Sequence, residues 1–273
     1  MMVLREDFQE WFKDTDAFDG IFNLEGRIFR EHKNRKTFRI VKDGKGYFVK
    51  THRSVGWNEI LKNIIRLKMP VLGAWNEVHA IKRLEELGVA TMRMVGYGVR
   101  GTPPAWLDSF VITEELENTI SLEDFTRNWC VTPPDTLLKR MLILKVADIA
   151  RRLHRNGVNH RDFYICHFFL DLTSLNEKSG YEGLTVYLID LHRVQLREKT
   201  PQRWIIKDLA GLFFSSMDIG LTQRDVFRFL REYTGKPLRS ILKEDRNFWR
   251  HVNRRAVKLY RKHFGRDPGI AME

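Results

Sequence analysis

The chain has 273 residues, which is long enough for one large domain or two lobes with a buried core. With 43% hydrophobic and 30% charged residues, its composition is that of a folded globular protein and excludes wholesale disorder. The formal net charge of +12 predicts an anionic partner, which could be nucleic acid, a phosphate-rich small molecule, an acidic protein or an anionic membrane surface.

Two further features bear on the cellular compartment. The two cysteines, Cys130 and Cys166, offer neither a disulfide framework nor a paired-cysteine metal spacing, which favours a reducing compartment, the cytosol. The first residues carry acids early and lack a signal-peptide core, and no window approaches about eighteen uninterrupted apolar residues. We therefore expect no membrane-spanning helix.

The first part of the chain has the pattern of an antiparallel sheet. Between Gly26 and Thr51 apolar and polar residues alternate, with breaks at Asn34 and at the sequence DGKG, and this predicts three short strands. Residues 92–101 and 108–116 have the same character and predict two more strands.

Helices are predicted between and after these strands. Apolar residues three and four positions apart predict an amphipathic helix over Trp57–Leu72, and a second helix is expected over residues 74–88, closed by its final glycine. A long helix is predicted over residues 135–157. Residues 184–196 predict a strand, and the chain beyond Lys207 is expected to be mostly helical.

The two halves of the chain therefore differ in secondary structure. The sequence predicts an α+β protein with a small antiparallel-sheet lobe with inserted helices, residues 1–116, and a mostly helical lobe that ends in basic helices, residues 117–273. A ligand cleft between two such lobes is the natural expectation.

Four short motifs with candidate catalytic or ligand-binding side chains follow one another along the chain. They are a lysine at the end of a strand, a glutamate on a helix, a His-Arg-Asp loop and an aspartate after an apolar strand: Lys50, Glu77, His160-Arg161-Asp162 and Asp190. This order resembles the protein-kinase fold. It predicts a bilobal, protein-kinase-like fold whose first lobe binds the nucleotide and whose second lobe holds the catalytic loop.

Longer strings carry a more specific resemblance over nearly the whole chain. They include GYFVKTHR, KMPVLGAWNE, GVNHRDFYICHF, IDLHR and PQRWIIKDLAGLFFSSMDIGLTQRD. By these strings the chain is identified as a member of the lipopolysaccharide core heptose kinase family of Gram-negative bacteria. The resemblance implies transfer of phosphate from ATP to a hydroxyl, O-4, of the first inner-core heptose, at the cytoplasmic face of the inner membrane.

The four motifs match the needs of phosphoryl transfer, which are a cation at the donor phosphates, carboxylate-held Mg²⁺ and a base at the acceptor. Lys50 suits the donor phosphates, with Glu77 as its ion-pair partner. Asp190 suits Mg²⁺, which prefers oxygen ligands, and Asp162 suits the acceptor hydroxyl. Plainer alternatives are a surface lysine, a glutamate on a solvated helix face, and aspartates that only cap turns.

The resemblance also implies supporting residues. His160 and Arg161 belong to the catalytic loop. Asp208 opens a helix, and in the kinase fold such an aspartate hydrogen-bonds the loop backbone; its alternative is to cap its own helix. The segment expected to contact ATP at the end of the last N-terminal strand comprises Glu114, Glu115 and Leu116.

The sequence departs from the usual kinase pattern in two places. Where a kinase has its second metal-binding asparagine, this chain has His167, which could hold metal, orient Asp162 or contact the acceptor. The glycine-rich phosphate loop is missing. In its place, Arg35 and Lys36 could meet phosphates by charge or form a solvated basic turn.

The segment after Asp190 bears on the acceptor. It reaches Asp208 too soon to contain a long activation segment, so a small molecule or glycolipid is favoured over a protein. Alternatives are a kinase of another core sugar, a small alcohol or protein tyrosine; a basic scaffold without catalysis that binds nucleic acid or an acidic protein; and an inactive kinase. Nucleic acid is not expected, because the aromatic residues lie mostly on apolar helix faces.

Two basic segments bear on partners. Trp57–Leu72 either lies on an anionic membrane or packs on the first lobe. Arg246–Lys262 is predicted to dock through Trp249, Val252 and Leu259, with a basic face that contacts phosphorylated glycolipid or anionic lipid, or is simply solvated. The net charge would also suit an acidic partner such as acyl carrier protein.

Overall fold

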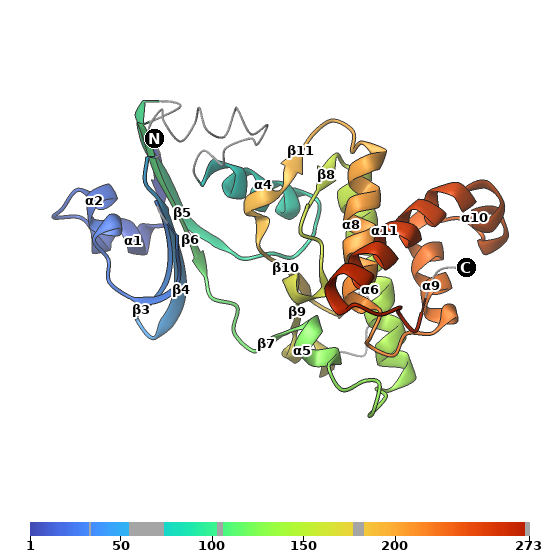
Figure 1. The fold of residues 1–273 in the computed structure, drawn as a ribbon. Coiled ribbons are helices and arrows are strands. Elements are labelled where there is room, and N and C mark those ends of the chain that lie inside the picture. Colours follow the sequence, from blue (N-terminus) through green and yellow to red (C-terminus); the bar gives the residue numbers. More distant parts are fainter. Residues whose placement is uncertain (33, 55–73, 103–105, 177–182, 271–273) are drawn as a thin grey trace. The chain divides into compact units, whose positions relative to one another are not determined.

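The chain divides into two compact units in the computed structural model, which describes all residues except 33, 55–73, 103–105, 177–182 and 271–273 (Figure 1). The first unit comprises Met1–Arg83 and Met92–Leu116, and the second comprises Leu84–Thr91 and Glu117–Glu273. The segment Leu84–Thr91, which lies in the predicted first lobe, thus belongs to the second unit. The predicted α+β class is confirmed.

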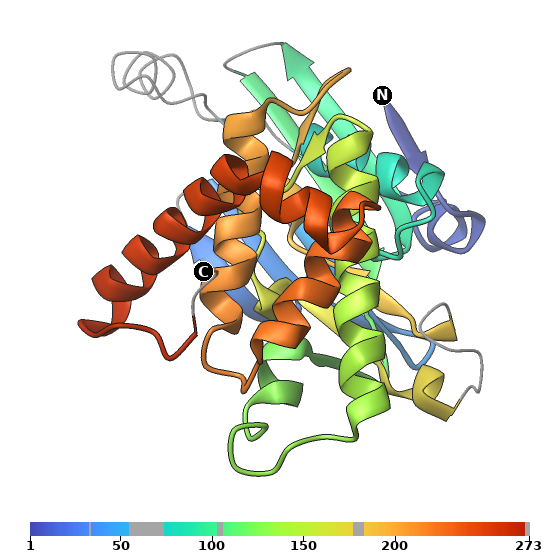
Figure 2. The ribbon, with the colours of Figure 1, turned by 90° about the vertical axis from the view of Figure 1, so that its right-hand side faces the viewer.

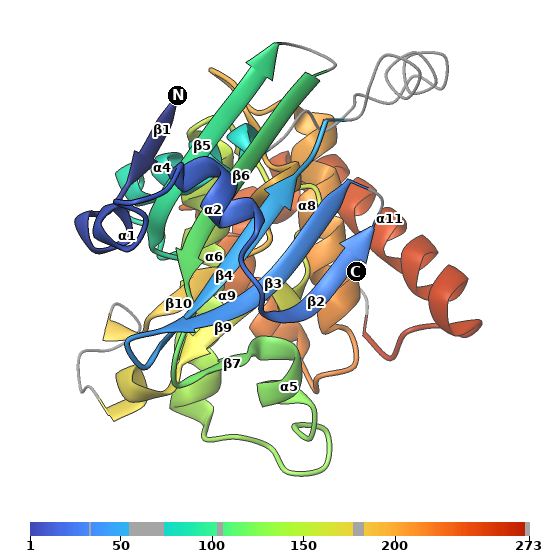
Figure 3. The ribbon, with the colours of Figure 1, turned by 90° about the vertical axis from the view of Figure 1, so that its left-hand side faces the viewer.

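The first unit is built on a six-stranded antiparallel sheet in the order β1-β5-β6-β4-β3-β2 (Figure 3). Alternating burial along the strands places one apolar face against a core. The predicted strands are confirmed as β2 to β6, whereas β1 was not predicted. Their bounds are Met2–Leu4 (β1), Arg27–His32 (β2), Arg35–Lys42 (β3), Lys45–His52 (β4), Met94–Thr102 (β5) and Trp106–Glu114 (β6).

Two short helices that the sequence analysis missed, α1 (Glu6–Trp11) and α2 (Ala17–Phe22), cover one face of this sheet (Figure 3). Their side chains Phe8 and Ile21 are fully buried and join Phe110 of the sheet in one core. Burying aromatic and aliphatic area of this size is the main stabilising contribution to such a small unit.

Helix α4 (Trp75–Glu86) confirms the second predicted helix. Val78 and Ile81, which lie on its buried face, are at most 1% exposed, and the same face carries Glu77. Gly88 follows the helix with a φ of 64°, a left-handed conformation that suits glycine after a helix end. The helix predicted over Trp57–Leu72 lies outside the described residues.

The second unit is mostly helical (Figure 2). Helix α6 packs against α9 and helix α8 packs against α11. No helix in the described part of the chain is long and apolar enough to cross a membrane. The helices are α5 (Leu122–Thr126), α6 (Thr136–Arg155), α8 (Gln202–Ser216), α9 (Gln223–Thr234), α10 (Leu238–Glu244) and α11 (Arg246–Phe264).

Short strands and 3₁₀ turns hold the loops of the second unit. One small sheet has the order β10-β9-β7, and a second pairs β11 with β8. The strands are β7 (Thr119–Ser121), β8 (Val158–Asn159), β9 (Phe168–Asp171), β10 (Val186–Leu188) and β11 (Gln195–Leu196). The 3₁₀ turns are η1 (Ile165–His167), η2 (Leu172–Asn176) and η3 (Leu191–Arg193).

The single strand predicted over residues 184–196 is wrong. The chain forms β10, turns through η3 and then forms β11, which belongs to a different sheet. Asp190 causes the break because its φ of 61° is left-handed and incompatible with a continuous strand. This turn places Asp190 at the end of β10, next to the His-Arg-Asp loop.

Candidate active site

The His-Arg-Asp loop is held by a carboxylate from helix α8. The expectation that Asp208 opens its helix is wrong, because α8 begins at Gln202 after the N-cap Pro201 and Asp208 lies inside it. Asp208, only 1% exposed, accepts the main-chain N–H of His160 at 2.6 Å and that of Arg161 at 2.9 Å. Arg161 has a φ of 76°, an unfavourable conformation for a residue with a side chain. The two charge-assisted hydrogen bonds stabilise this turn, because ionised acceptors bind amides more strongly than neutral ones.

His160 is a fully buried member of the loop. Its Nε2–H donates to the carbonyl oxygen of Ile189 at 3.0 Å, which ties the loop to the chain just before Asp190. Its Nδ1 has no hydrogen-bond partner in the described part of the chain. Burial lowers the pKa of His160 below its usual value, so the ring is neutral at pH 7.

Asp162 follows in the same loop and is aligned by an arginine. Nη1 of Arg193, from turn η3, donates to both carboxylate oxygens of Asp162, at 2.7 and 2.8 Å. The Asp162 side chain is 18% exposed, so it is open to a small reactant. Arg193, which lies three positions after Asp190, was not among the residues predicted from the sequence.

His167 connects Asp162 with Asp190. Its Nδ1–H donates to the main-chain oxygen of Asp162 at 2.7 Å, and its Nε2 lies 3.6 Å from an Asp190 carboxylate oxygen. The other Asp190 oxygen lies 2.6 Å from Nδ1 of His192. The second unit therefore brings Asp162, His167 and Asp190 together, because β9 begins directly after His167 and β10, which pairs with it, ends two residues before Asp190.

Of the side chains that meet at Asp190 in the described part of the chain, only the carboxylate of Asp190 itself is a suitable ligand for a hard cation; His167 and His192 contribute imidazoles. Among the described residues, no group of three or more His, Cys, Asp or Glu side chains could hold a metal ion by itself. This fits Mg²⁺, which kinase-type sites bind with one or two carboxylates and with oxygen atoms of the substrate phosphates. It does not fit a closed metal site made of protein ligands alone.

The first unit contains a second pair of candidate residues. Lys50, on β4, forms an ion pair with Glu77 of α4, and both lie in the same unit. The Glu77 side chain is 2% exposed and its Oε2 has no hydrogen-bond partner in the described part of the chain. A carboxylate buried this deeply needs its cation, because an unpaired buried charge is strongly unfavourable.

The segment at the end of β6 has its acidic side chains engaged. Glu114 is bound by Arg5, and Glu115 forms an ion pair with Arg39 at 2.7 Å. The main-chain N–H of Glu115 also donates to the carbonyl oxygen of Gly46 at 3.0 Å. Arg5 and Arg39 thus already hold the side chains of these two carboxylates.

The two basic residues considered for phosphate binding lie at the start of β3. Burial, followed by the nearby Arg30, lowers the pKa of Arg35. Nζ of Lys36 lies 4.9 Å from the ring centre of Phe38, a cation–π distance. Both residues are thus part of the sheet rather than of a turn that projects from it.

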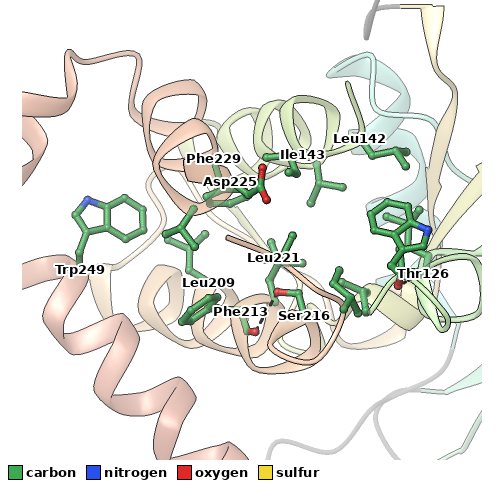
Figure 4. Close-up of a pocket in the computed structure, with 17 residues that line it drawn as sticks. Thr126, Leu142, Ile143, Leu209, Phe213, Ser216, Leu221, Asp225, Phe229 and Trp249 are labelled. Atoms are coloured by element: carbon green, nitrogen blue, oxygen red, sulfur yellow. Dashed lines mark hydrogen bonds between the residues drawn. The ribbon is translucent and has the colours of Figure 1, made fainter. Parts of the chain in front are cut away.

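The second unit also contains an apolar cavity of about 90 Å³ (Figure 4). Side chains of α6, α8 and α9, such as Leu142, Phe213 and Phe229, line it, and Trp249 of α11 reaches it as well. Asp225 is the charged residue in this lining, and its carboxylate is bound by Lys139. This cavity was not predicted from the sequence.

The basic C-terminal segment forms α11. Trp249 and Val252 are buried as predicted, but Ala256 and Tyr260 complete the buried stripe, and Leu259 is only half-buried. The stripe repeats every three to four residues, so the helix docks by one face. The opposite face exposes Arg246, Arg250, Arg254, Arg255, Lys258, Arg261 and Lys262.

Taken together, an antiparallel sheet with a Lys–Glu pair and a helical unit with a carboxylate-held His-Arg-Asp loop define a protein-kinase-like phosphotransferase. Residues 19–233 match the lipopolysaccharide kinase (Kdo/WaaP) family, and the chain belongs to this family.

Similar proteins agree with this assignment. The chain is 48% identical over 261 residues to the lipopolysaccharide core heptose(I) kinase WaaP of Pseudomonas aeruginosa, and equally to that of Escherichia coli K12, with 96% of each chain covered. A solved structure described as WaaP in complex with acyl carrier protein superposes with a TM-score of 0.81 at 44% identity. The superposition covers 95% of this chain and 99% of that one, which confirms the kinase-like fold.

Proposed function

We propose that the protein transfers the γ-phosphate of ATP to a hydroxyl, O-4, of the first heptose of the lipopolysaccharide inner core. The relatives that match almost the whole chain are named lipopolysaccharide core heptose(I) kinases. The observation that carries the proposal is the convergence of Asp162, His167 and Asp190 in the second unit, with Asp162 aligned by Arg193.

Asp162 acts on the acceptor. Its carboxylate orients the acceptor hydroxyl and takes up the hydroxyl proton as the new O–P bond forms and the bond from the γ-phosphorus to the bridging oxygen of ADP breaks, with ADP as the leaving group. Arg193 fixes the direction of this carboxylate by its two hydrogen bonds. Asp208 keeps the loop backbone in place, so Asp162 needs no rearrangement before the reaction.

Asp190 is the residue that we assign to Mg²⁺. Bound there, Mg²⁺ would neutralise charge on the transferred phosphate. We assign His167 to positioning rather than to the metal, because imidazole prefers softer ions than Mg²⁺. Its Nδ1–H already fixes the main chain of Asp162, and its Nε2 faces the Asp190 carboxylate.

The first unit is the part that we assign to ATP. Lys50 contributes the cation for the donor phosphates, and Glu77 fixes its position. Because the side chains of Glu114 and Glu115 are engaged by arginines, we assign ATP contact at the end of β6 to the main chain, up to Leu116. Arg35 and Lys36 add positive charge at the start of β3.

An assay with labelled ATP, Mg²⁺ and lipopolysaccharide from a strain that lacks core phosphate tests this proposal. The parent protein should label the glycolipid, and Asp162→Ala should reduce the rate at least about a hundredfold, the low end for removal of a general base. Asp14→Ala, at an exposed aspartate of the first unit, is the matched control and should keep the parent rate. Equal labelling by the parent and Asp162→Ala would reject the role of Asp162.

The same assay separates the possible acceptors. Label in another core sugar or in a small alcohol, with none in the first heptose, would move the function to a related kinase. Analysis of the labelled product by NMR identifies the phosphorylated hydroxyl, and any position other than O-4 would contradict that detail of the proposal.

A partner follows from the same relatives. A related structure contains acyl carrier protein, and the exposed basic face of α11 offers an acidic protein a complementary surface. An acyl carrier protein also brings a fatty acyl chain, and we assign the end of that chain to the apolar cavity shown in Figure 4. The partner should therefore bind more tightly when it is acylated.

Calorimetry with acylated and unacylated acyl carrier protein tests the partner. The double substitution Arg250→Glu and Lys258→Glu on α11 should weaken both complexes and reduce their dependence on salt, because it removes charge from the proposed contact. Equal affinity for the two forms would reject the role of the cavity, and unchanged affinity of the variant would reject α11 as the surface.

The acceptor also implies a membrane surface. We propose that the protein works as a peripheral protein at the cytoplasmic face of the inner membrane, where the basic face of α11 can meet anionic lipid. Co-sedimentation with anionic and with neutral vesicles tests this, and equal recovery with the two would reject an electrostatic contact.

A further inference from the structure

Beside the catalytic loop, four cations surround one tryptophan ring. Trp204 lies in the first turn of α8. The charged groups lie at cation–π distances from its ring centre, at 5.1 Å for Lys207, 5.4 Å for Arg161, 5.6 Å for Arg203 and 5.9 Å for Arg197. These four cations and Trp204 are called the Trp204 cluster below.

The Trp204 cluster has no carboxylate partners in the described part of the chain. Arg161, Arg203 and Lys207 form no ion pair there, and Arg197 donates to the side-chain oxygens of Asn159 and Gln195, both of which are neutral. Two buried donors, Nε of Arg161 and Nε1 of Trp204, also lack a hydrogen-bond acceptor among the described residues. Buried donors without an acceptor are rare in folded proteins.

Holding these cations together is unfavourable. Burial, then the neighbouring Arg161 and Arg193, lowers the pKa of Lys207. Burial and then Arg193 likewise lower the pKa of Arg161. Crowded like charges and unsatisfied donors, which a purely structural role would not select, are typical of a site that is completed by a ligand.

The position of the Trp204 cluster indicates which reactant it serves. The carboxylates that act most strongly on Arg161 and Lys207 are Asp162 and Asp208, not Asp190. Arg193, which also acts on both, binds Asp162 directly. Since Arg161 directly precedes Asp162 in the loop, the cluster borders the carboxylate assigned to the acceptor.

We infer that the Trp204 cluster binds an oxyanionic group of the acceptor, a carboxylate or phosphate carried by the glycolipid near the sugar whose hydroxyl meets Asp162. Guanidinium groups suit both oxyanions because their N–H groups donate in pairs. The inference rests on the proposed function and adds to it a recognition site for the acceptor. It accounts for the unpaired cations and the unsatisfied donors together.

Steady-state kinetics of Arg203→Gln and Lys207→Gln test the inference. Each substitution should raise the KM for the glycolipid about tenfold or more, the effect of one charge-assisted hydrogen bond. The kcat and the KM for ATP should stay within about twofold. Arg203 is exposed, so its substitution should not disturb folding, and Arg239→Gln on the exposed side of α10 is the matched control.

Equilibrium binding of the glycolipid without ATP separates the two oxyanions. If the anion is a carboxylate, methyl esterification of the acceptor's carboxyl groups should remove the difference in affinity between the parent and Lys207→Gln. If it is a phosphate, treatment of the acceptor with phosphatase should do so instead. Either result supports the inference, and an affinity difference that survives both treatments overturns it.

Failure of the inference can be told from failure of the proposed function. A parent protein that labels no glycolipid would reject the proposed function itself. An active parent whose cluster variants keep the parent KM for the glycolipid would overturn only the inference. A rise in the KM for ATP in place of the KM for the glycolipid would overturn it as well, because the cluster would then hold donor phosphates.

Discussion

Two groups of cations, one in each unit, are arranged in opposite ways. In the first unit two cations are neutralised in pairs, Lys50 with Glu77 and Arg39 with Glu115. In the second unit Arg161, Arg203 and Lys207 crowd around Trp204 without carboxylate partners in the described part of the chain. The charges of the first arrangement are balanced within the protein, whereas those of the second are balanced only when an anion binds.

Stabilising charges and binding charges should therefore respond differently to substitution. Removing one member of a buried pair leaves the other charge unpaired and should destabilise the fold. Removing one member of a crowded cluster relieves repulsion and should leave the fold as stable or more stable, at the expense of binding. The four predictions below test this contrast.

The largest effect on stability is expected at Asp208, a carboxylate of the second unit that binds main-chain N–H groups and not a cation. Asp208→Ala leaves the N–H groups of His160 and Arg161 without their acceptor, so the free energy of unfolding should fall by about 4 kcal/mol, from two buried donors. Asp208→Asn keeps one oxygen and should lose about half as much. Urea denaturation measures both, and equal stability of Asp208→Ala and the parent would contradict the prediction.

The paired arrangement is tested at Lys50. Lys50→Met leaves Glu77 buried and unpaired and should lower the free energy of unfolding by about 2 kcal/mol, less than for a fully buried pair because Lys50 is partly exposed. Adding Glu77→Gln should restore most of this loss, since the uncompensated charge is then gone. Thermal denaturation of the two single variants and the double variant provides the cycle. A double variant less stable than Lys50→Met would contradict the pairing argument.

The neutral His160 predicts a dependence of stability on pH. Because burial lowers its pKa in the folded protein, the unfolded chain binds the proton first as the pH falls below about 6.5, the usual histidine value. Stability should be fully present above that pH and fall by up to about 1.4 kcal/mol per pH unit below it. Urea denaturation at pH 7.5 and 5.5 measures the loss, which His160→Gln should reduce. If His160→Gln loses as much stability between these two pH values as the parent, the loss belongs to other titratable groups.

The smallest effect is expected in the Trp204 cluster itself. Lys207→Met removes one of the crowded cations and should raise the free energy of unfolding by about 0.5 kcal/mol, a value limited by solvent screening. Thermal denaturation at low salt measures it. A loss of stability of the size predicted for Lys50→Met would erase the contrast between the two units.

The sequence predicted the parts of the fold that depend on local pattern. Alternation and turn residues were sufficient for β2 to β6, and helical spacing was sufficient for α4 and α6. It missed β1 because three residues carry no periodicity, and this strand exists only by pairing with β5, far along the chain. The short helices α1 and α2 were missed for the same reason, since their stability comes from packing on the sheet.

The candidate site was partly predictable. Ordered motifs pointed to Asp162, Asp190 and the Lys50–Glu77 pair, whose ion pair the structure contains, and their roles stay predictions. Arg193 and the Trp204 cluster could not be found, because nothing in a sequence shows that cations from the catalytic loop, from the residue after β11 and from α8 meet around one ring. Within the sequence, only the positions of Arg203 and Lys207 close to Trp204 indicate that cations can lie beside this ring.

The two hydrogen bonds between the catalytic loop and Asp208 affect how this loop opens to solvent. The amides of His160 and Arg161 are bonded to a side chain of α8, so their exchange with solvent requires that this contact with the helix be broken. Loop and helix thus form one cooperative unit, although they are far apart along the chain. A mutation that unfolds α8 around Asp208 would therefore disorder the catalytic turn without touching it.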